Sequence, residues 1–210
     1  MKKAPKSADA HMEEAPKEVR AKVSVFVGAS LDGFIARKNG DLDWLEGPGG
    51  SPGEDYGYRA FVSRIDALVM GRGTFEKVLT FKEWPYGKKP VFVLTHRPLV
   101  IPPKLTGTVE AMSGTPAEVV ARLAKRGLHR LYVDGGKTIQ EFIAAGLVDE
   151  LIASRLPVLI GEGIPLFGPV PADIRLKHVE TRTFAGGVVQ SVYKIEKPRG
   201  GGHRTRAPRK

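Results

Sequence analysis

The sequence predicts an α/β fold: a three-layer, mostly parallel sheet extended by antiparallel strands at its C-terminal end. Three observations support this. Short apolar runs alternate with segments of helical periodicity between residues 22 and 156. Each run ends at a turn of glycine or polar residues, as in parallel strands joined by helices. The last two runs, 174–179 and 188–196, are joined through Gly186 and Gly187 without a helix, which predicts an antiparallel pair.

The composition is that of a folded protein that works in water. The chain has 210 residues, of which 41% are hydrophobic and 27% charged, and no apolar run is long enough to cross a bilayer. Cysteine is absent, which excludes a disulfide framework, a thiolate nucleophile and a cysteine metal site. We therefore expect a cytoplasmic protein without membrane association, while the lack of cysteine is also compatible with export.

The net charge of +10 lies mainly in the two ends of the chain. Residues 1–20 hold five basic and four acidic side chains and no apolar signal core, so we interpret them as a disordered N-terminal arm. Residues 198–210 hold five basic side chains and no acid, and we interpret them as a disordered tail. The body, residues 21–197, keeps 23 basic and 19 acidic residues, a net charge of +4. Loose nucleic-acid binding through the tail stays open, but a solubilising role is the preferred interpretation.

Each element of the body has its own local signal. Apolar runs predict strands at residues 22–29, 66–70, 90–95, 109–112, 131–133 and 151–156. Apolar spacing and start signals predict helices at 58–65, at 74–79 with Thr74 as N-cap, at 115–127 with a capping box at Thr115 and Glu118, and from Gly136 to just before Leu147. Segments 31–36, 46–57 and 158–167 are interpreted as loops because glycine, proline and turn residues interrupt them.

Three of the turns that follow strands have the composition of a phosphate-binding edge. They are Gly71-Arg72-Gly73-Thr74, Thr95-His96-Arg97 and Asp134-Gly135-Gly136. Adjacent glycines let a ligand approach the main chain closely, and the first N–H groups of the following helix, with Lys137 and Thr138, face that ligand. Ligands of parallel sheets bind beyond the carboxyl ends of the strands, where these turns meet.

The two arginines of this edge suggest which anion it holds. Arginine presents a rigid fork that suits phosphate oxygens, and several phosphates spread along one sheet edge are typical of a dinucleotide. Arg72 and Arg97 in separate turns would suit an additional ribose phosphate. Two plainer interpretations stay open. Gly135 and Gly136 can form a tight turn without a ligand, and each arginine taken alone can form a surface ion pair.

Several of these segments resemble known families. Val69-Met70-Gly71-Arg72-Gly73-Thr74-Phe75-Glu76 resembles the signature of the dihydrofolate reductases. The segments beginning Ser30-Leu31-Asp32-Gly33, Asp134-Gly135-Gly136 and Pro157-Val158-Leu159 resemble the C-terminal reductase domain of bifunctional riboflavin-biosynthesis proteins (deaminase-reductases). Together they cover nearly all of the body in the family order. The resemblance implies a dihydrofolate-reductase-like fold, an NADPH site and a homodimer.

The resemblance also implies a set of cofactor-binding positions. Gly71, Arg72, Gly73 and Thr74 would line the pyrophosphate and adenosine side, with Arg72 toward the ribose phosphate, and Leu94, Thr95, His96 and Arg97 would hold adenine and the same phosphate. Gly135, Gly136, Lys137 and Thr138 after Asp134 would cradle the pyrophosphate, with a cis peptide between the two glycines. Val27, Gly28, Ala29 and Ile35 would flank the nicotinamide.

The sequence departs from both families where the substrate would bind. The dihydrofolate reductases have three glycines at the turn that Asp134 opens here, and the helix carboxylate that meets their pterin has no certain counterpart. The riboflavin enzymes carry an Asp-Asp-Pro-x-Leu motif after the second strand, and this chain does not. These departures concern the substrate more than the cofactor.

Hydride transfer from NADPH requires alignment and exclusion of water, and a proton for the reduced substrate. Asp32 and Asp55 are the catalytic candidates, against the alternatives of a turn-capping aspartate for Asp32 and an exposed loop acid for Asp55. An apolar wall for a flat heterocycle can come from Trp44, Tyr56, Tyr58 and Phe61, unless they are plain core.

We therefore expect an NADPH-dependent reductase of a small pterin-like or ribosylaminopyrimidine-like substrate. The alternative is a protein of the same fold that binds a nucleotide without turning it over.

Overall fold

The computed structural model describes residues 20–45 and 53–196. The predicted N-terminal arm, apart from Arg20, and the basic tail lie outside the described residues. The same holds for residues 46–52 of the predicted glycine- and proline-rich loop. Within the described ranges, no helix is both long and apolar enough to cross a membrane.

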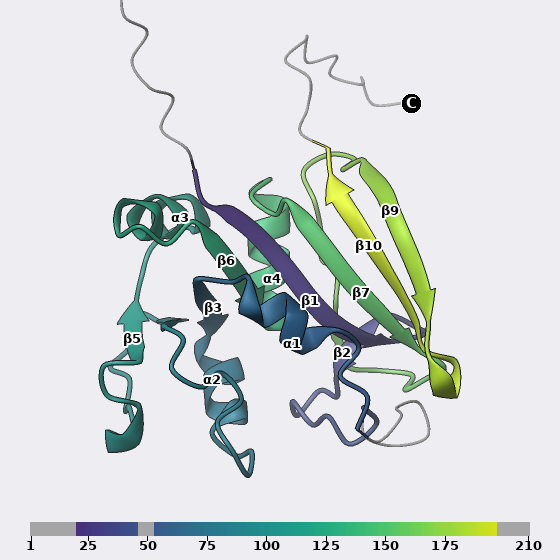
Figure 1. Cartoon of the computed structure of the whole chain (residues 1–210), viewed down its shortest axis with the longest axis horizontal. Coiled ribbons are helices and arrows are strands. Elements are labelled where there is room, and N and C mark those ends of the chain that lie inside the picture. The colour runs from purple at the N-terminus through teal and green to yellow at the C-terminus, as the bar shows by residue number, and fades with distance from the viewer. Residues whose placement is uncertain (1–19, 46–52, 197–210) are drawn as a thin grey trace, which may run out of the picture.

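The predicted sheet is confirmed, and it contains eight strands in the order β5-β4-β3-β6-β1-β7-β10-β9 (Figure 1). The six strands from β5 to β7 are parallel to their neighbours, and β10 is antiparallel to both β7 and β9. The strands are β1 (Lys22–Ser30), β3 (Ala67–Gly71), β4 (Val91–Leu94), β5 (Val109–Met112), β6 (Arg130–Asp134), β7 (Glu150–Leu156), β9 (Leu176–Thr183) and β10 (Val189–Ile195).

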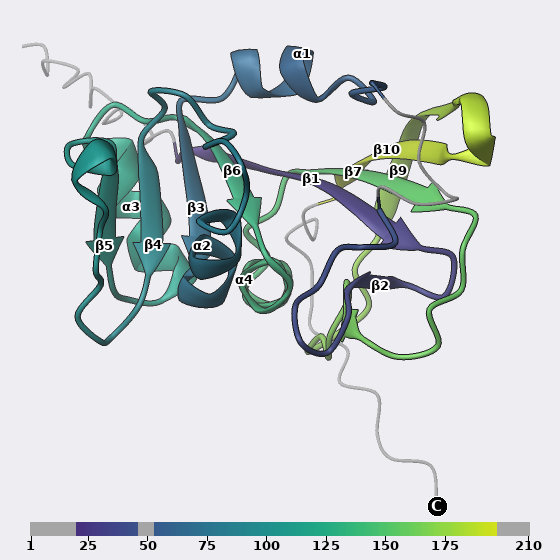
Figure 2. The same ribbon diagram turned by 90° about the horizontal axis from the view of Figure 1, so that it is seen from below.

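Helices cover both faces of the sheet and complete the three layers. They are α1 (Tyr58–Ser63), α2 (Arg72–Val78), α3 (Pro116–Lys125) and α4 (Gly136–Ala144), with 3-10 turns at Pro103–Leu105 and Ala185–Gly187. Figure 2 shows α1 and α4 on opposite faces. The predicted capping box of α3 is present: the Thr115 hydroxyl accepts from the Glu118 N–H, and the Glu118 carboxylate accepts from the Thr115 N–H.

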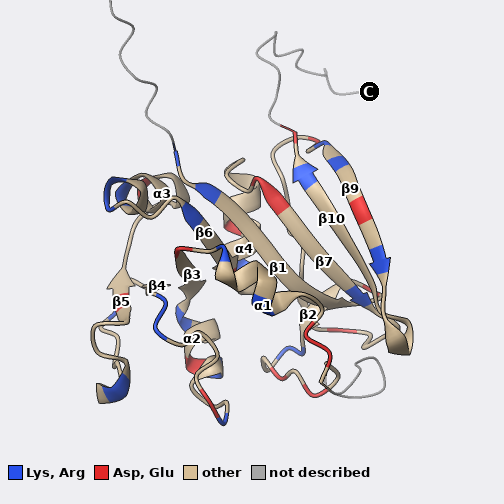
Figure 3. Cartoon of the chain, viewed as in Figure 1, with Lys and Arg blue, Asp and Glu red and all other residues tan. Residues whose placement is uncertain are grey.

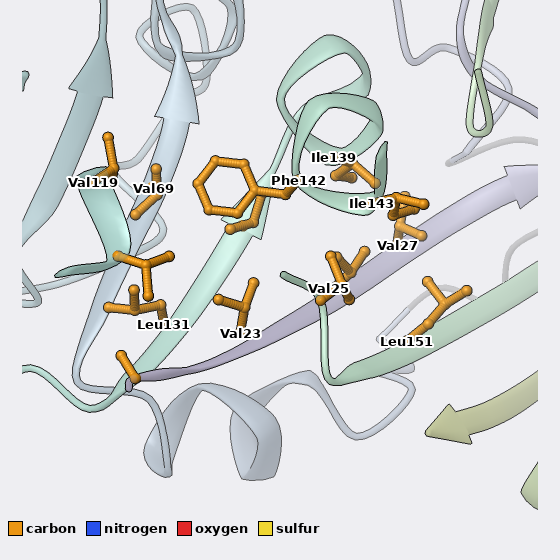
Figure 4. Packing of buried hydrophobic residues seen from close by; sticks show 14 of the residues in the cluster. Val23, Val25, Val27, Val69, Val119, Leu131, Ile139, Phe142, Ile143 and Leu151 are labelled. Atoms are coloured by element: carbon orange, nitrogen blue, oxygen red, sulfur yellow. The ribbon is translucent and has the colours of Figure 1, made fainter. Parts of the chain in front are cut away.

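Alternate residues of the central strands enter two different cores, because successive side chains of a strand point to opposite faces. Val23, Val25 and Val27 of β1 pack with Ile139, Phe142 and Ile143 of α4 and with α3 (Figure 4). On the opposite face, Leu68 and Met70 of β3 pack with side chains of α1 and α2. The nearly continuous apolar runs of the sequence therefore reflect strands that are buried on both sides.

The structure differs from the sequence predictions in three details. Two short strands, β2 (Phe34–Ala36) and β8 (Ile164–Pro165), pair inside segments predicted as loops; at three and two residues they are too short to show a period. β9 continues to Thr183, beyond the predicted end at residue 179. The prediction of Thr74 as N-cap is wrong: the extended Gly71 caps α2, which begins at Arg72.

Candidate functional site

The neighbouring strands β1 and β6 diverge within the sheet, and we call the place where they part the slot. The two strands pair only over Lys22–Ser24 and Arg130–Tyr132. Beyond that point β1 continues beside β7 as far as Ser30, and β6 continues beside β3 as far as Asp134, so the two strands diverge toward their carboxyl ends (Figure 4). The Tyr132 hydroxyl spans the divergence and donates to the Phe26 carbonyl at 2.9 Å. Parallel sheets bind ligands at openings of this kind.

Two of the three predicted turns meet at the mouth of this slot. A Cβ built on Gly135 would lie 2.0 Å from the Thr74 hydroxyl oxygen, and a Cβ on Gly71 would lie 3.0 Å from the Thr138 hydroxyl oxygen. Gly135 has φ +91°, which disfavours any side chain. The two turns pack so closely that the starts of α2 and α4 lie side by side. The expected cis peptide is not found: no described peptide bond is cis, and the positive φ of Gly135 alone turns the chain into α4.

Neither of these two helix starts is closed by a side chain. The N-caps of α2 and α4 are glycines and make no side-chain cap hydrogen bond, in contrast to α3. The first N–H groups of a helix lack intrahelical partners and carry partial positive charge. Two such starts in contact form an environment suited to an anion.

The remaining residues of these turns differ in how they are held. Thr138 is buried, whereas Gly73 is exposed, with no atom within 4 Å of an added Cβ. Lys137 is exposed and lies 4.0 Å from the Glu141 carboxylate, one helical turn further on. Gly136 is packed against Ile164 and Ile35, whose side-chain atoms lie 2.6 and 3.2 Å from an added Cβ.

Arg72 connects the first turn to the third, which follows β4. Its Nε donates to Glu76 at 2.7 Å, and its NH1 donates to the Pro98 carbonyl at 2.9 Å. In the third turn, the Thr95 hydroxyl accepts from the Arg97 N–H at 3.1 Å, and the side chains of His96 and Arg97 are exposed. Leu94 and Thr95 are half-buried. All three predicted turns therefore lie along one edge, with Arg72 held partly by an internal ion pair.

The four residues predicted beside the nicotinamide border the slot from two sides. Val27 and Ala29 are buried in the core that α4 covers. Gly28 points to the other face, where a Cβ would lie 3.0 Å from Leu45 and 3.5 Å from Leu156. The Ile35 side chain of β2 packs against Gly136, where an added Cβ would lie 3.2 Å from it.

Asp134 closes the slot on the β6 side within a cluster of tyrosines. Its carboxylate accepts from the Gly135 N–H at 2.8 Å and from the Tyr86 hydroxyl at 3.3 Å. Burial is the main cause that raises the pKa of Asp134, and the hydrogen bonds oppose it. Burial and the Asp134 charge raise the pKa of Tyr58, Tyr86 and Tyr132, so all three hydroxyls keep their protons. Proton-bearing groups therefore surround this end of the slot.

Asp32 fastens two loops to each other. The Ser30 hydroxyl donates to its carboxylate at 2.6 Å, and the N–H groups of Ile160 and Gly161 donate to it at 3.3 and 2.8 Å. These bonds, that of Ser30 first, hold the pKa of Asp32 below its usual value. These hydrogen bonds also hold the loop that leads into β8. This loop in turn positions Ile164, whose side chain packs against Gly136. The turn-holding alternative describes this geometry, and a lowered pKa makes the residue a poor proton donor.

We expect Asp32→Asn to loosen the 158–163 loop, because an amide cannot accept both sets of hydrogen bonds as an ion does. Hydrogen exchange at Ile160 and Gly161 should accelerate relative to wild type. In wild type the bonds persist above the unfolded-state pKa and weaken as the pH falls through the lowered folded-state pKa. The control is Asp173→Asn, the same change at an exposed residue. Unchanged exchange in the loop would contradict the fastening role.

Asp55 caps α1. It accepts from the Gly57 N–H at 2.9 Å and the Arg59 N–H at 3.1 Å, and these bonds lower its pKa. This geometry matches the loop-acid alternative more closely than that of a proton donor aimed at the slot.

A cavity of about 310 Å³ lies beside α1 on the same face of the sheet as Phe26. Phe26, Phe61, Ile152 and Val192 supply its apolar surface, and Tyr56 borders it. Of the four residues predicted to form an apolar wall, Tyr56 and Phe61 line this cavity. The other two lie elsewhere: Trp44 is buried with Leu156 and Val188, and Tyr58 packs against Phe26. Sequence reasoning missed Phe26, Tyr86 and Tyr132. A tyrosine two residues before Asp134 was the available signal for Tyr132.

The comparisons with known proteins agree with this geometry. The sequence model of the RibD C-terminal domain matches residues 21–190. The uncharacterized protein YyaP of Bacillus subtilis (strain 168) is 35% identical over 177 residues, covering 80% of this chain and 91% of YyaP.

Two solved structures share the fold. A putative riboflavin biosynthesis protein from Shewanella sp. PV-4 is 37% identical with a TM-score of 0.78, over 84% of this chain and 99% of that one. A dihydrofolate reductase from Enterococcus faecalis, complexed with NADP(H), is 19% identical with a TM-score of 0.60, over 84% and 97% of the two chains. At that identity, the second likeness concerns the fold alone.

Proposed function

Because the chain belongs to the RibD C-terminal domain family, we propose that it is an NADPH-dependent reductase of a pterin-like or ribosylaminopyrimidine-like heterocycle. NADPH, when bound, supplies the hydride. The observation that supports the proposal most is the contact of two uncapped helix starts at the mouth of the slot between β1 and β6. A pyrophosphate needs such main-chain donors, and a flat nicotinamide suits a slot between diverging strands.

In this proposal, the chain's own residues divide the binding of the cofactor. The starts of α2 and α4 hold the pyrophosphate, through the N–H groups near Gly73, Thr74, Gly136, Lys137 and Thr138. Gly71 and Gly135 allow the two starts to approach each other. Leu94, Thr95 and His96 border the adenosine, and Arg72 and Arg97 hold a ribose phosphate. Val27, Gly28, Ala29 and Ile35 flank the nicotinamide and exclude water from it.

Asp134 is the proposed source of the proton. A carboxyl group whose pKa is raised by burial keeps its proton closer to neutral pH, which suits a general acid. The Tyr86 hydroxyl, at 3.3 Å, donates a hydrogen bond to this carboxylate and helps to fix its position. Asp32 and Asp55 have lowered pKa values and are committed to main-chain N–H groups, so the role passes from them to Asp134.

The cofactor assignment is tested by comparing NADPH with NADH. We expect Arg97→Ala to weaken NADPH binding about tenfold and to leave NADH binding nearly unchanged, because only NADPH carries the extra phosphate. Arg72→Ala should act in the same direction. Titration of the cofactor, followed by its fluorescence, measures both constants. Arg59→Ala is the matched control, since Arg59 is 91% exposed on α1.

Each possible result of this titration has a distinct meaning. Equal losses of NADPH and NADH in Arg72→Ala would assign that side chain to holding the Pro98 turn and not to the phosphate. Failure of the wild type to bind either cofactor would refute the reductase proposal. The absorbance of NADPH in the presence of candidate heterocycles measures its oxidation. If NADPH binds but its absorbance does not fall, the alternative of nucleotide binding without catalysis is favoured.

The proposal includes a homodimer in the cytoplasm, where NADPH-dependent synthesis takes place. The edge strand β9 supports an assembly of two chains. Within the described part of the chain it pairs with β10 alone, nearly all of its residues are exposed, and Leu176 and Val179 are 43% and 49% exposed. An exposed edge strand of eight residues is a surface suited to association.

A further inference from the structure

The cavity beside α1 is lined mainly by uncharged groups, and Phe26 connects it to β1, the strand that borders the slot. The rings of Phe26 and Phe61 pack against each other at a tilt of 34° with their centroids 5.0 Å apart, and Ile152 and Val192 extend the apolar surface across β7 and β10. Gln190 is 3% exposed and donates at 3.0 Å to both the Tyr56 carbonyl and the Ser154 hydroxyl. Ser154 is level with Gly28 in the sheet, so this neutral amide lies at the end nearest the slot.

The charged side chains that line the cavity are already paired with each other. Arg64 lies 2.6 Å from Glu150, which also accepts from the Ser24 hydroxyl at 3.1 Å. Arg182 lies 2.8 Å from Glu180 on β9. In Figure 3, β9 carries an acidic segment between basic ones, and β7 begins with an acidic segment. Among the described residues, the lining therefore contains two arginines and two glutamates, whose charges sum to zero.

This pairing disfavours a phosphate in the cavity. A phosphate group would have to displace Glu150 or Glu180 from its arginine, or bind with that carboxylate beside it, and like charges in proximity repel each other. Lys194 faces Glu150 across the β7–β10 pair, but it is exposed and lies outside the lining. The cavity volume, about 310 Å³, is at the lower end of the range for small-molecule sites.

We propose that the substrate held in this cavity is a flat, uncharged heterocycle without a phosphate group, and not a sugar phosphate. The inference rests on the proposed reductase function and narrows it to one of its two substrate classes. The half-buried ring of Phe26, which packs against Phe61, offers an apolar surface to the flat ring, and Gln190 offers a neutral polar contact near the reacting end. The ion pairs leave no arginine of the described lining unpaired for an anionic substituent.

The test uses a pair of ligands that differ only by phosphate: 6-hydroxymethylpterin and its monophosphate. Dissociation constants are measured on the full chain by calorimetry, with and without saturating NADPH. We expect the wild type to bind the unphosphorylated member about tenfold more tightly. Equal affinities, a preference for the phosphate, or no binding of either member would overturn the proposal.

One variant gives the described lining a net positive charge and leaves its apolar surface unchanged. Glu180→Gln leaves Arg182 without its carboxylate and should strengthen binding of the monophosphate about fivefold, with the unphosphorylated member unchanged. The control is Glu162→Gln, which removes a carboxylate from the exposed Lys38 pair elsewhere. If both variants changed the affinity for the monophosphate equally, the net charge of the protein, and not the ion pairs that line the cavity, would determine that affinity. The proposal would then fail.

The NADPH titration separates this inference from the function on which it rests. Normal cofactor binding with the wrong order of pterin affinities would overturn the substrate class alone. Loss of cofactor binding in the wild type would overturn the reductase function, while the pterin pair, measured without NADPH, would still decide what the cavity accepts.

Discussion

Gly135→Ala is expected to destabilise the protein by about 3–4 kcal/mol and to abolish cofactor binding. The added methyl carbon would lie 2.0 Å from the Thr74 hydroxyl oxygen, and the backbone at φ +91° disfavours a side chain. Relief requires the starts of α2 and α4 to move apart, which separates the two sets of N–H groups that we assign to the pyrophosphate. Chemical denaturation and an NADPH titration measure the two losses.

A glycine elsewhere in the chain separates the two causes of this loss. Gly146 has φ +66°, but an added Cβ there would meet no atom of the described residues within 4 Å. Gly146→Ala should therefore cost about 1 kcal/mol and leave cofactor binding intact. The double variant Thr74→Ala with Gly135→Ala should recover part of the stability, because the hydroxyl oxygen is gone. Equal costs at Gly135 and Gly146 would mean that backbone conformation alone, and not the contact of the turns, requires Gly135.

Asp134→Asn is expected to lower kcat about 100-fold on any substrate with which the wild type oxidises NADPH. The amide keeps the size of the carboxyl group but cannot release a proton. The limb of the pH–rate profile that reports this acid should also disappear. Asp173→Asn, at an exposed position, should change neither quantity. An unchanged kcat in Asp134→Asn would remove Asp134 from the reaction and leave water as the proton source.

The same variant is expected to be more stable than the wild type at neutral pH. Burial raises the folded-state pKa of Asp134 above its ordinary value of 3.8, so the folded chain binds this proton more tightly than the unfolded chain. That contribution is fully present below the unfolded-state pKa and is lost as the pH rises through the folded-state pKa. A neutral amide avoids the loss. Urea unfolding at several pH values checks this, and a gain that persisted at low pH would contradict it.

Several features followed from the sequence because their signals are local. The apolar runs predicted the buried strands, since a strand covered on both faces must be apolar at successive positions. Thr115, Pro116 and Glu118 predicted the start of α3, because a capping box is complete within four residues. The three edge turns followed from strand direction, because the carboxyl ends of parallel strands meet at one edge of the sheet.

Other features depended on contacts between distant segments. Thr74 reads as an N-cap by its type, but the helix begins earlier and the side chain instead packs on Gly135. Asp32 reads as an acid near the nicotinamide, but its bonds to Ile160 and Gly161, 128 and 129 residues away, hold a loop. β2 and β8 are too short for a period to show and pair only once the chain has folded back.

The sequence by itself determined the layers, the strand direction and the edge at which the three turns meet, because period, composition and turn chemistry act over a few residues. Only the tertiary structure decided which acid has a raised pKa and which charged side chains line the cavity. Burial raises the pKa of Asp134, and Glu150 at the start of β7 pairs with Arg64, which directly follows α1. Both effects depend on neighbours that are far away in the chain.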